Sequence, residues 1–347
     1  MRNPTVDILK ALASQLIVLH HLMLYTPMSN SVAELWPALH GLLSNEARYV
    51  VQIFLVIGGY LAAKSLTRLL KEEAGGLGPK TAITLVAQRY WRLVKPYWVA
   101  IAAALVLGAS AAWLAGSPMD AERPSLWQVL AHLVLLHDIV GVQALSAGVW
   151  YVAIDLQLFA GAVFLVWACR RLADSPIGQW WTPHTTWVVA ASSITVLSLL
   201  WWNTRPELDE WAVYFAGSYG LGVLAHWAVA HHRRVSVATA IALVLAAALW
   251  FQWRERLLIT GITAILMIYS DALAPVLRAL NGRLMQAMAD MSYCVFLIHY
   301  PVLVFTSAVV LWMGIENTAA MGLALLATWA LSMAVGWVMH RWIEVQR

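Results

Sequence analysis

Long apolar segments alternate with short polar ones along the chain, and this pattern predicts membrane-spanning helices. A helix crosses the hydrocarbon core of a bilayer with about 20 predominantly apolar residues. The pattern therefore predicts an all-α integral membrane protein, a polytopic bundle of about ten transmembrane helices that forms one domain over residues 1–347. The predicted spans cover residues 5–27, 48–68, 97–116, 148–169, 185–203, 211–230, 235–252, 256–273, 289–312 and 319–340.

Two further apolar segments are predicted to lie at the membrane surface. Residues 125–140 are too short for a span and contain His132, His137 and Asp138, so we expect a re-entrant or interfacial segment. Residues 31–45 are expected to form an interfacial helix on the outer side.

Basic residues set the predicted orientation, because cytoplasmic loops carry an excess of Lys and Arg. Arg2 places the N-terminus in the cytoplasm, and the first helix is expected to be retained rather than cleaved as a signal peptide. If residues 125–140 do not cross, both termini are cytoplasmic and every basic cluster falls inside. These clusters lie at residues 64–95, 170–171, 231–234, 278–283 and 340–347.

Composition supports the membrane assignment and excludes other classes. Charged residues make up 12% of the chain, whereas soluble domains carry roughly a quarter. Many of the 20 Trp residues stand at the ends of apolar segments, as in an interfacial aromatic belt. The net charge of +4 is small and scattered, so we expect membrane lipid and not nucleic acid as a partner. Cys169 and Cys294 are expected to be buried free thiols.

Ionisable side chains inside predicted spans are costly, and they mark candidate functional sites. The first span carries Asp7, Lys10, His20 and His21. Lys10 and His21 are eleven positions apart, which places them about 20° apart around a helix and roughly 16 Å along it. Asp7, Ser14 and His21 share nearly the same face, and His20 points about 100° away. The alternative is an ion pair of Asp7 with Lys10 and a structural, hydrogen-bonded His21.

Three more polar groups stand out in the later segments. Arg89 and Arg92 precede Pro96, which is expected to interrupt the helix, and their guanidinium groups suit phosphate recognition. The alternative is that these two arginines only anchor the cytoplasmic end of the helix, as the positive-inside rule describes. Asp155 is expected to pair with His21 at a similar depth. His299 has Ser292 on the same face, and a structural role for His299 stays open beside a functional one.

At these residues the chain resembles the acyltransferase-3 family of membrane acyltransferases. Lys10 and His21 match the family's basic residue and histidine separated by ten residues. The segment from Ile53 to Tyr60 is similar to its Phe-Phe-x-x-Ser-Gly-Phe element, with Gly58 in the place of serine and with Gly59 and Tyr60 as expected site support. The Arg-x-x-Arg element is matched by Arg89 and Arg92.

The resemblance continues to the end of the chain. The Trp-x-Leu-x-x-Glu-x-Gln-Phe element is similar to residues 150–159, with Asp155 in the place of glutamate. The late Ser-Tyr element is matched by Ser292, Tyr293, His299 and Pro301, and a closing glutamate by Glu344. The correspondence covers nearly the whole chain in order, and we expect a membrane domain without a fused esterase-like domain.

The resemblance implies a multi-pass enzyme of the inner membrane that moves an acyl group, commonly acetyl, from cytoplasmic acyl-CoA. The acceptor is a hydroxyl of an envelope carbohydrate or glycolipid. His21 is the expected general base, oriented by Asp155, while Arg89 and Arg92 bind the CoA phosphates and Lys10 supports CoA or a polar path. Acyl-CoA is the donor substrate, and no metal is expected.

Two other functions remain open at this point. The polar face of the first helix suits a transporter path for protons or a substrate. Gly58 and Asp155 are compatible with a non-catalytic subunit of a polysaccharide export complex. The sequence leaves open the acyl chain, the acceptor, the oligomeric state, and whether transfer is direct or passes through an acyl-enzyme.

Overall fold

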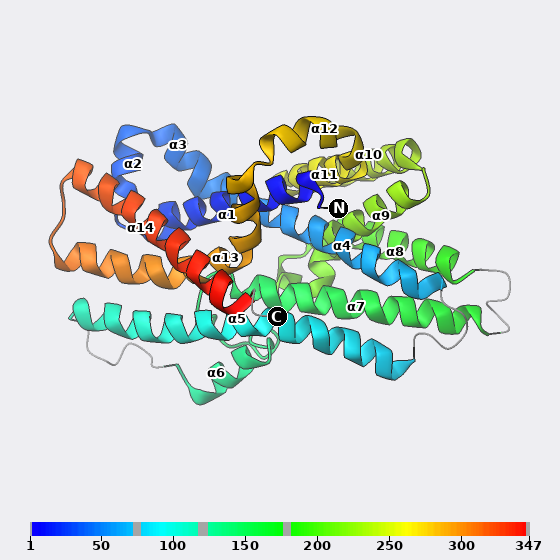
Figure 1. Ribbon diagram of the computed structural model, residues 1–347, viewed down its shortest axis with the longest axis horizontal. Coiled ribbons are helices and arrows are strands. Elements are labelled where there is room, and N and C mark those ends of the chain that lie inside the picture. Colours follow the sequence, from blue (N-terminus) through cyan, green and yellow to red (C-terminus); the bar gives the residue numbers. More distant parts are fainter. Residues whose placement is uncertain (1, 72–77, 117–123, 176–181, 345–347) are drawn as a thin grey trace. The chain divides into compact units, whose positions relative to one another are not determined.

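The structure is a computed structural model that describes residues 2–71, 78–116, 124–175 and 182–344. Most of the predicted cytoplasmic loop at residues 71–80, and the last three residues of the C-terminal basic cluster, lie outside the described residues. Helices make up nearly all of the described chain, and it contains no strand (Figure 1). The all-α prediction is therefore confirmed.

The long helices are α1 (Pro4–Tyr25), α4 (Val51–Lys71), α5 (Pro79–Leu114), α7 (Val149–Ala173), α8 (Pro183–Leu200), α9 (Ala212–Ala230), α10 (Arg234–Phe251), α11 (Glu255–Ile268), α12 (Ser270–Leu280), α13 (Arg283–Trp312) and α14 (Thr318–Met339). Most of the predicted spans correspond to one long helix each, but α5 begins 18 residues before the predicted span at 97–116, and the predicted span at 256–273 is divided between α11 and α12. Shorter elements are α2 (Ser29–Leu35), α3 (Pro37–Gly41), η1 (Leu42–Glu46), η2 (Ala47–Val50), α6 (Leu126–Leu133), η3 (Trp202–Thr204), η4 (Pro206–Leu208) and η5 (His340–Glu344).

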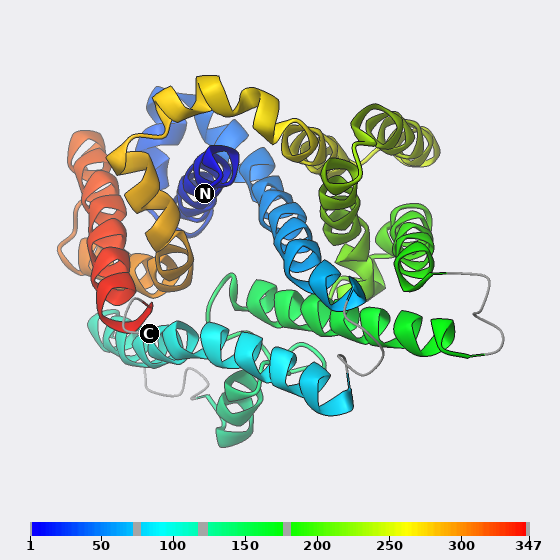
Figure 2. The ribbon, with the colours of Figure 1, turned by 45° about the vertical axis from the view of Figure 1, so that its right-hand side comes forward.

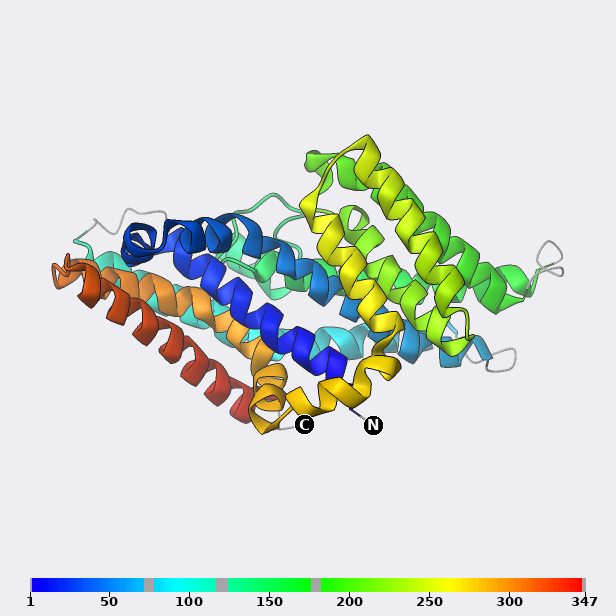
Figure 3. The ribbon, with the colours of Figure 1, turned by 90° about the horizontal axis from the view of Figure 1, so that it is seen from above.

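The polytopic architecture is confirmed, with fewer clear spans than ten. Within the described residues, 8 helices are long and apolar enough to cross a membrane. A ninth span is formed if α11 and α12 count together, although they meet at a bend of 94° (Figure 3). The α9 helix is not among them, since Tyr214, Ser218, Tyr219 and His226 make it more polar. Three of these side chains, those other than His226, are buried.

The chain divides into two compact units, and the single domain expected from the sequence stays a prediction. The first unit contains Met1–Val6, Gln52–Trp91 and Val152–Leu280. The second contains Asp7–Val51, Arg92–Tyr151 and Asn281–Arg347. In the first unit α8 packs along α9, and α10 and α11 pack on α9 as well (Figure 2). In the second unit α13 and α14 pack side by side.

The core of the second unit is an apolar cluster that holds α1 against α13 and α14. Its buried members include Val18 and Leu22 from α1, Val295 and Leu303 from α13, and Leu325 from α14. Burying a side chain of this size contributes about 1.5–3 kcal/mol relative to leaving it exposed to water, although lipid reduces that gain. This cluster fixes the rotation of α1 and therefore the direction of its histidines.

Pro96 does not interrupt its helix, which corrects the sequence-based expectation. The α5 helix is continuous from Pro79 to Leu114 with Pro96 inside it. Proline removes one intrahelical hydrogen bond and frees the carbonyl four residues earlier. Inside a membrane protein, side chains of neighbouring helices re-satisfy such backbone groups. The Tyr293 hydroxyl of α13 donates to the Leu93 carbonyl, one residue after the Arg92 carbonyl that Pro96 leaves without its helical donor, over 2.9 Å.

The segment after α5 does not form a spanning helix, in agreement with the prediction for residues 125–140. The α6 helix has 8 residues and is capped by the Ser125 side chain, which accepts from the Gln128 amide. Behind it, the buried rings of His132 and His137 stack with centroids 4.2 Å apart. The Nδ1 of His132 donates to the Gln128 carbonyl, and its Nε2 accepts from the Leu145 amide.

This histidine pair must be neutral in the folded segment. Burial, and then the neighbouring His132, lowers the pKa of His137 to about 3, and burial also lowers the pKa of His132. Both values lie below the ordinary histidine pKa of about 6.5, so the unfolded segment binds more protons as the pH falls. The free energy of unfolding of this segment therefore decreases below about pH 6.5.

We expect the amides of α6 and of residues 134–145 to lose hydrogen-exchange protection when the pH is lowered from 7 to 4. Exchange is measured by mass spectrometry and corrected for the intrinsic pH dependence of the rate. The amides of α10, a helix without histidine, are the internal control and keep their protection. Equal protection of α6 at both pH values contradicts the conclusion that His132 and His137 are buried in the neutral form.

Candidate functional site

Two histidines from distant parts of the chain form a hydrogen-bonded pair in the second unit. The Nδ1 of His21 on α1 lies 2.7 Å from Nε2 of His299 on α13. The two rings stack with centroids 5.0 Å apart and planes 12° apart. Both side chains are buried. The sequence placed each histidine in the site but did not predict that they pair.

The hydrogen bonds assign a proton to each ring. The Nδ1 of His299 lies 3.2 Å from the Val295 carbonyl, which can only accept, so Nδ1 carries the proton. In neutral His299 the Nε2 is then an acceptor, and His21 donates to it from Nδ1. The Nε2 of His21 is left with its lone pair and has no hydrogen-bond partner in the described part of the chain. This nitrogen is in the state that a general base requires.

His20 has a different role from His21. Its Nδ1 donates to the carbonyl of Leu43 in η1 over 2.9 Å. The prediction that the two side chains point in different directions is confirmed by their separate partners. The bond attaches the end of α1 to the chain that follows it, so the structure gives His20 a structural contact.

Two tyrosines that the sequence analysis missed surround the His21 ring. The Tyr25 ring lies 5.5 Å from it and the Tyr300 ring 6.4 Å, between centroids. The two tyrosines contact each other edge to face. Tyr25 follows His21 by one helical turn and Tyr300 is next to His299, and this spacing is the signal that could have identified them.

The inner part of α1 carries its charges differently from the simple ion pair considered as an alternative. Asp7 accepts a hydrogen bond from the Asn281 side chain over 3.0 Å. Lys10 interacts electrostatically with Glu344 most strongly, then with Asp290 and Asp7. Lys10 therefore lies near carboxylates from α1, α13 and η5.

Glu344 is also the centre of a small cluster with Cys294 and His340. It accepts from the Cys294 thiol over 3.4 Å and from the His340 Nδ1 over 2.8 Å. Among the described residues, this is the one group of His, Cys and acidic side chains with ligand atoms close enough for a metal, all within 4.8 Å. Hydrogen bonds among the three residues account for the arrangement.

Asp155 pairs with Arg89, a partner that the sequence analysis did not predict, and its orienting role at His21 stays a prediction. In the first unit, Nη2 and Nε of Arg89 donate to the same Asp155 oxygen over 2.6 and 3.1 Å. Asp155 is 4% exposed, and the Arg89 guanidinium also lies over the Phe159 ring. A buried carboxylate needs a partner of opposite charge, and a cation meets that need better than a neutral imidazole.

Gly58 and Gly59 bring α4 close to α9 beside this ion pair. A Cβ on Gly59 would lie 1.9 Å from the Tyr219 carbonyl oxygen. A Cβ on Gly58 would lie 3.3 Å from the Tyr219 ring and 3.4 Å from an Asp155 oxygen. A side chain at position 58 would therefore contact the Tyr219 ring, which lies next to Asp155. Tyr60, the other expected support residue, packs edge to face on the His226 ring of α9.

The remaining predicted residues have local contacts. The Ser292 hydroxyl donates to the Ala289 carbonyl of its own helix, so it supports α13 rather than reaching His299. Arg92 follows Arg89 by three residues on α5 and is exposed. Tyr293, which belongs to the late Ser-Tyr motif, donates to the carbonyl of Leu93, the residue after Arg92. Tyr293 therefore holds α13 against α5 next to Arg92 and is a positioning residue.

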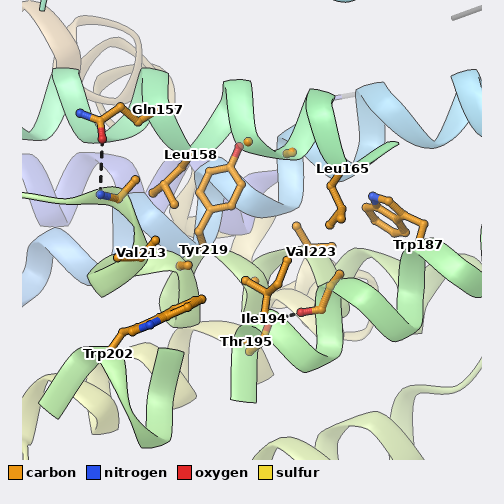
Figure 4. Close-up of a pocket in the computed structure, with 16 residues that line it drawn as sticks. Gln157, Leu158, Leu165, Trp187, Ile194, Thr195, Trp202, Val213, Tyr219 and Val223 are labelled. Carbon is orange, nitrogen blue, oxygen red and sulfur yellow. Dashed lines mark hydrogen bonds between the residues drawn. The ribbon is translucent and has the colours of Figure 1, made fainter. Parts of the chain in front are cut away.

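An apolar cavity of about 250 Å³ lies between α7, α8 and α9 in the first unit (Figure 4). Its walls include Leu158 and Leu165 of α7, Ile194 of α8 and Val223 of α9. Tyr219 also lines it, so the same side chain separates the cavity from Gly58 and Asp155. This cavity was not predicted, because apolar residues that line it have the same pattern as residues that face lipid.

Residues 3–340 match the family model described as an acyltransferase domain, which is essentially the whole chain. No curated protein and no solved structure matches the chain. The match includes His21, His299, Arg89 and Asp155.

We expect Gly59→Ala to destabilise the protein strongly, because its Cβ meets backbone and α4 must move away from α9. Overpacking costs about 1–3 kcal/mol even where side chains can yield. Gly58→Ser should be tolerated, since the contacts at that position are ordinary after a small shift of Tyr219. Gly161→Ala, with open space at its Cβ, is the control. Thermal unfolding in detergent should rank Gly59→Ala as the least stable of the three variants. A Gly59→Ala protein as stable as the Gly161→Ala control contradicts the close packing of α4 on α9.

Proposed function

The chain belongs to the acyltransferase-3 family, and we propose that it transfers an acyl group from acyl-CoA to a hydroxyl of a cell-envelope carbohydrate or glycolipid. Acetyl-CoA is the donor to test first, and the inner membrane is the proposed location of this multi-pass protein. The observation that carries the proposal is the His21–His299 pair, which leaves the Nε2 of His21 unprotonated and without a partner in the described chain.

The proposed reaction needs one base and one leaving group. The Nε2 of His21 takes the proton of the acceptor hydroxyl while the oxygen attacks the thioester carbonyl. The tetrahedral intermediate collapses, the carbon–sulfur bond breaks, and the CoA thiolate leaves and is protonated by the imidazolium. General acid–base catalysis of this kind contributes typically about 10²–10⁴-fold. His299 accepts the other ring proton of His21 and holds the ring in the required tautomer.

Arg89, Arg92 and Lys10 are proposed to bind the CoA part of the donor. Arg89 uses Nε and Nη2 for Asp155, which fixes the plane of its guanidinium group. Arg92 follows on the same helix and is exposed. Planar guanidinium groups suit phosphates, and a group held by Asp155 loses less side-chain entropy on binding. Lys10 adds a third cation near the inner end of α1.

We expect His21→Ala to lower the rate of acyl transfer by at least about 100-fold, as loss of a general base requires. His20→Ala is the matched control, because it removes a neighbouring histidine whose bond to Leu43 is structural. The assay is in-membrane acyl transfer normalised to folded protein, and acyl-CoA binding should be unchanged in both variants. Full turnover in His21→Ala, or an inactive His20→Ala with an active His21→Ala, contradicts the assignment.

His299 is tested by two substitutions of different chemistry. Gln at this position retains an oxygen that accepts from His21 Nδ1, whereas Leu does not. We expect His299→Gln to keep a substantial part of kcat and His299→Leu to lose most of it, with KM for acyl-CoA the same in both. Equal kcat in the two variants shows that the tautomer of His21 is set elsewhere.

Arg89→Lys should weaken acyl-CoA binding by about tenfold even though the charge is kept, because the planar fork that holds Asp155 and phosphate is lost. Binding is measured by equilibrium titration of the purified protein. Arg171→Lys is the control, since Arg171 also lies over an aromatic ring but has no part in the site. Unchanged acyl-CoA affinity in a variant with Ala at both Arg89 and Arg92 shows that the two arginines only anchor the helix at the cytoplasmic side.

A further inference from the structure

Tyr25 and Tyr300 stand beside the His21–His299 pair, and the proposed reaction gives them no role. Their ring centroids lie 5.5 and 6.4 Å from the His21 ring, respectively. The two tyrosine rings lie 5.4 Å apart with their planes at 88°, so they meet edge to face. All four residues belong to the second unit. The two tyrosines are therefore part of the immediate surroundings of the proposed base.

The hydroxyl groups of both tyrosines have no hydrogen-bond partner in the described part of the chain. The two groups are close enough to interact electrostatically. Tyr25 is 48% exposed and Tyr300 is half-buried, so a ligand can reach both side chains. Hydrocarbon cannot satisfy a hydroxyl group. Two unpartnered hydroxyls inside a membrane protein therefore indicate that a polar ligand or water occupies the space in front of them.

The pair lies well before the end of α13, at the level of the histidines. From Tyr300 the helix continues to Trp312, about 18 Å at the rise of an α-helix. Trp312 is 67% exposed at the end of α13, where an interfacial aromatic residue is expected. Tyr25 contacts Tyr300, so it lies at the same level along α13. A place in the aromatic belt therefore does not account for the two tyrosines.

The groups around His21 suit a neutral sugar. The negative face of an aromatic ring attracts the weakly positive C–H groups of a pyranose ring. A phenolic hydroxyl can donate to or accept from a sugar hydroxyl, and the Nε2 of His21 can accept from another. Within the described residues no cationic side chain lies over either tyrosine ring, so the rings themselves hold no cation for the phosphates of CoA.

We propose that Tyr25 and Tyr300 bind the pyranose ring of the acceptor and place one of its hydroxyl groups at the Nε2 of His21. The proposal rests on the proposed function, which supplies a sugar as the acceptor. Because the two rings are perpendicular, only one can lie parallel to the sugar. The more exposed Tyr25 ring stacks on the pyranose, and the half-buried Tyr300 donates its hydroxyl to a sugar oxygen.

The first experiment measures how the acyl group divides between sugar and water. It uses the full-length protein in phosphatidylcholine nanodiscs, radiolabelled acetyl-CoA, and octyl glycosides of glucose, galactose, mannose and N-acetylglucosamine below their critical micelle concentrations. Acetylated glycoside and free acetate are quantified separately. The ratio of these two products does not depend on the amount of folded protein, so partial misfolding of a variant leaves it unchanged.

We expect Tyr25→Ala and Tyr300→Ala each to lower the ratio of acetylated glycoside to acetate at least about tenfold, with a matching rise in KM for the glycoside and not for acetyl-CoA. Trp312→Ala is the matched control, because it removes an exposed aromatic side chain from the same unit at a distance from His21. Its ratio should equal that of the wild type.

Phenylalanine separates stacking from hydrogen bonding at the two positions. We expect Tyr25→Phe to keep most of the product ratio, since the stacking ring is retained. Tyr300→Phe should lower the ratio about threefold to tenfold, as loss of one hydrogen bond requires. Full retention of the ratio in Tyr300→Phe, or a loss in Tyr25→Phe as large as in Tyr25→Ala, overturns the roles given to the two side chains.

The second experiment measures binding without acyl transfer. An octyl glycoside with a photoreactive diazirine on its sugar is illuminated with the protein in the absence of donor, and adducts are mapped by mass spectrometry. We expect adducts on the peptides that contain Tyr25 and Tyr300. Unmodified glycoside should compete, and octanol at the same concentration should compete at least about tenfold less well, because it lacks the sugar.

The possible results are distinct. An equal fall of the ratio in Trp312→Ala, or acetate release without acylation of any glycoside, overturns the proposal. A rise in KM for acetyl-CoA alone assigns the two tyrosines to the donor and overturns it as well. Adducts at the two tyrosines of a protein that neither transfers nor releases acetate refute the proposed function and retain a sugar site. Absence of adducts there overturns this site whether or not the protein is active.

Discussion

Polar groups inside the apolar helices have to find their partners within the protein, because hydrocarbon offers none. This constraint explains where the buried polar side chains lie. His21 bonds to His299, which in turn bonds to the Val295 carbonyl, so three groups are satisfied by two bonds. In the first unit the same requirement pairs Arg89 with Asp155. Each pairing joins helices that are distant in sequence, so satisfying the polar groups also fixes the packing.

Close helix packing is the second requirement, and glycine meets it in the first unit. Gly59 of α4 and Gly222 of α9 each face backbone of the other helix, and a Cβ on either would lie 1.9 Å from a carbonyl oxygen. Small residues at helix contacts are the usual means by which membrane helices approach closely. The approach places the Tyr219 ring against Gly58. At position 58, where the family motif has serine, a Cβ would lie 3.3 Å from this ring, so a small shift of Tyr219 accommodates a small side chain.

The sequence was sufficient to predict the helices and the faces of their polar residues, but not the partners of those residues. Hydrophobic segments located most of the long helices, but α5 begins at Pro79, well before its predicted span, and the predicted span at 256–273 is broken between α11 and α12. The 100° step separated His21 from His20. The pairing of Asp155 with Arg89 was not predicted, because a similar depth does not show which side chains meet. Pro96 was expected to end a helix, although a proline inside a membrane helix can be accommodated by its surroundings. Partners depend on tertiary packing, which one sequence without its fold does not specify.

The group that His21 meets in its own unit changes how the charge at this ring should be understood. In a serine-protease-type triad a buried carboxylate stabilises the imidazolium that forms during the reaction. Here the group at His21 Nδ1 is a neutral imidazole backed by a carbonyl, so the His21–His299 pair carries no charge before the reaction. An uncompensated buried anion would be costly in this environment. The positive charge arises on His21 only when the acceptor proton moves, at the moment when the negative oxyanion forms beside it. The developing ion pair therefore contains its own counter-charge, and a neutral His299 is sufficient to orient the base.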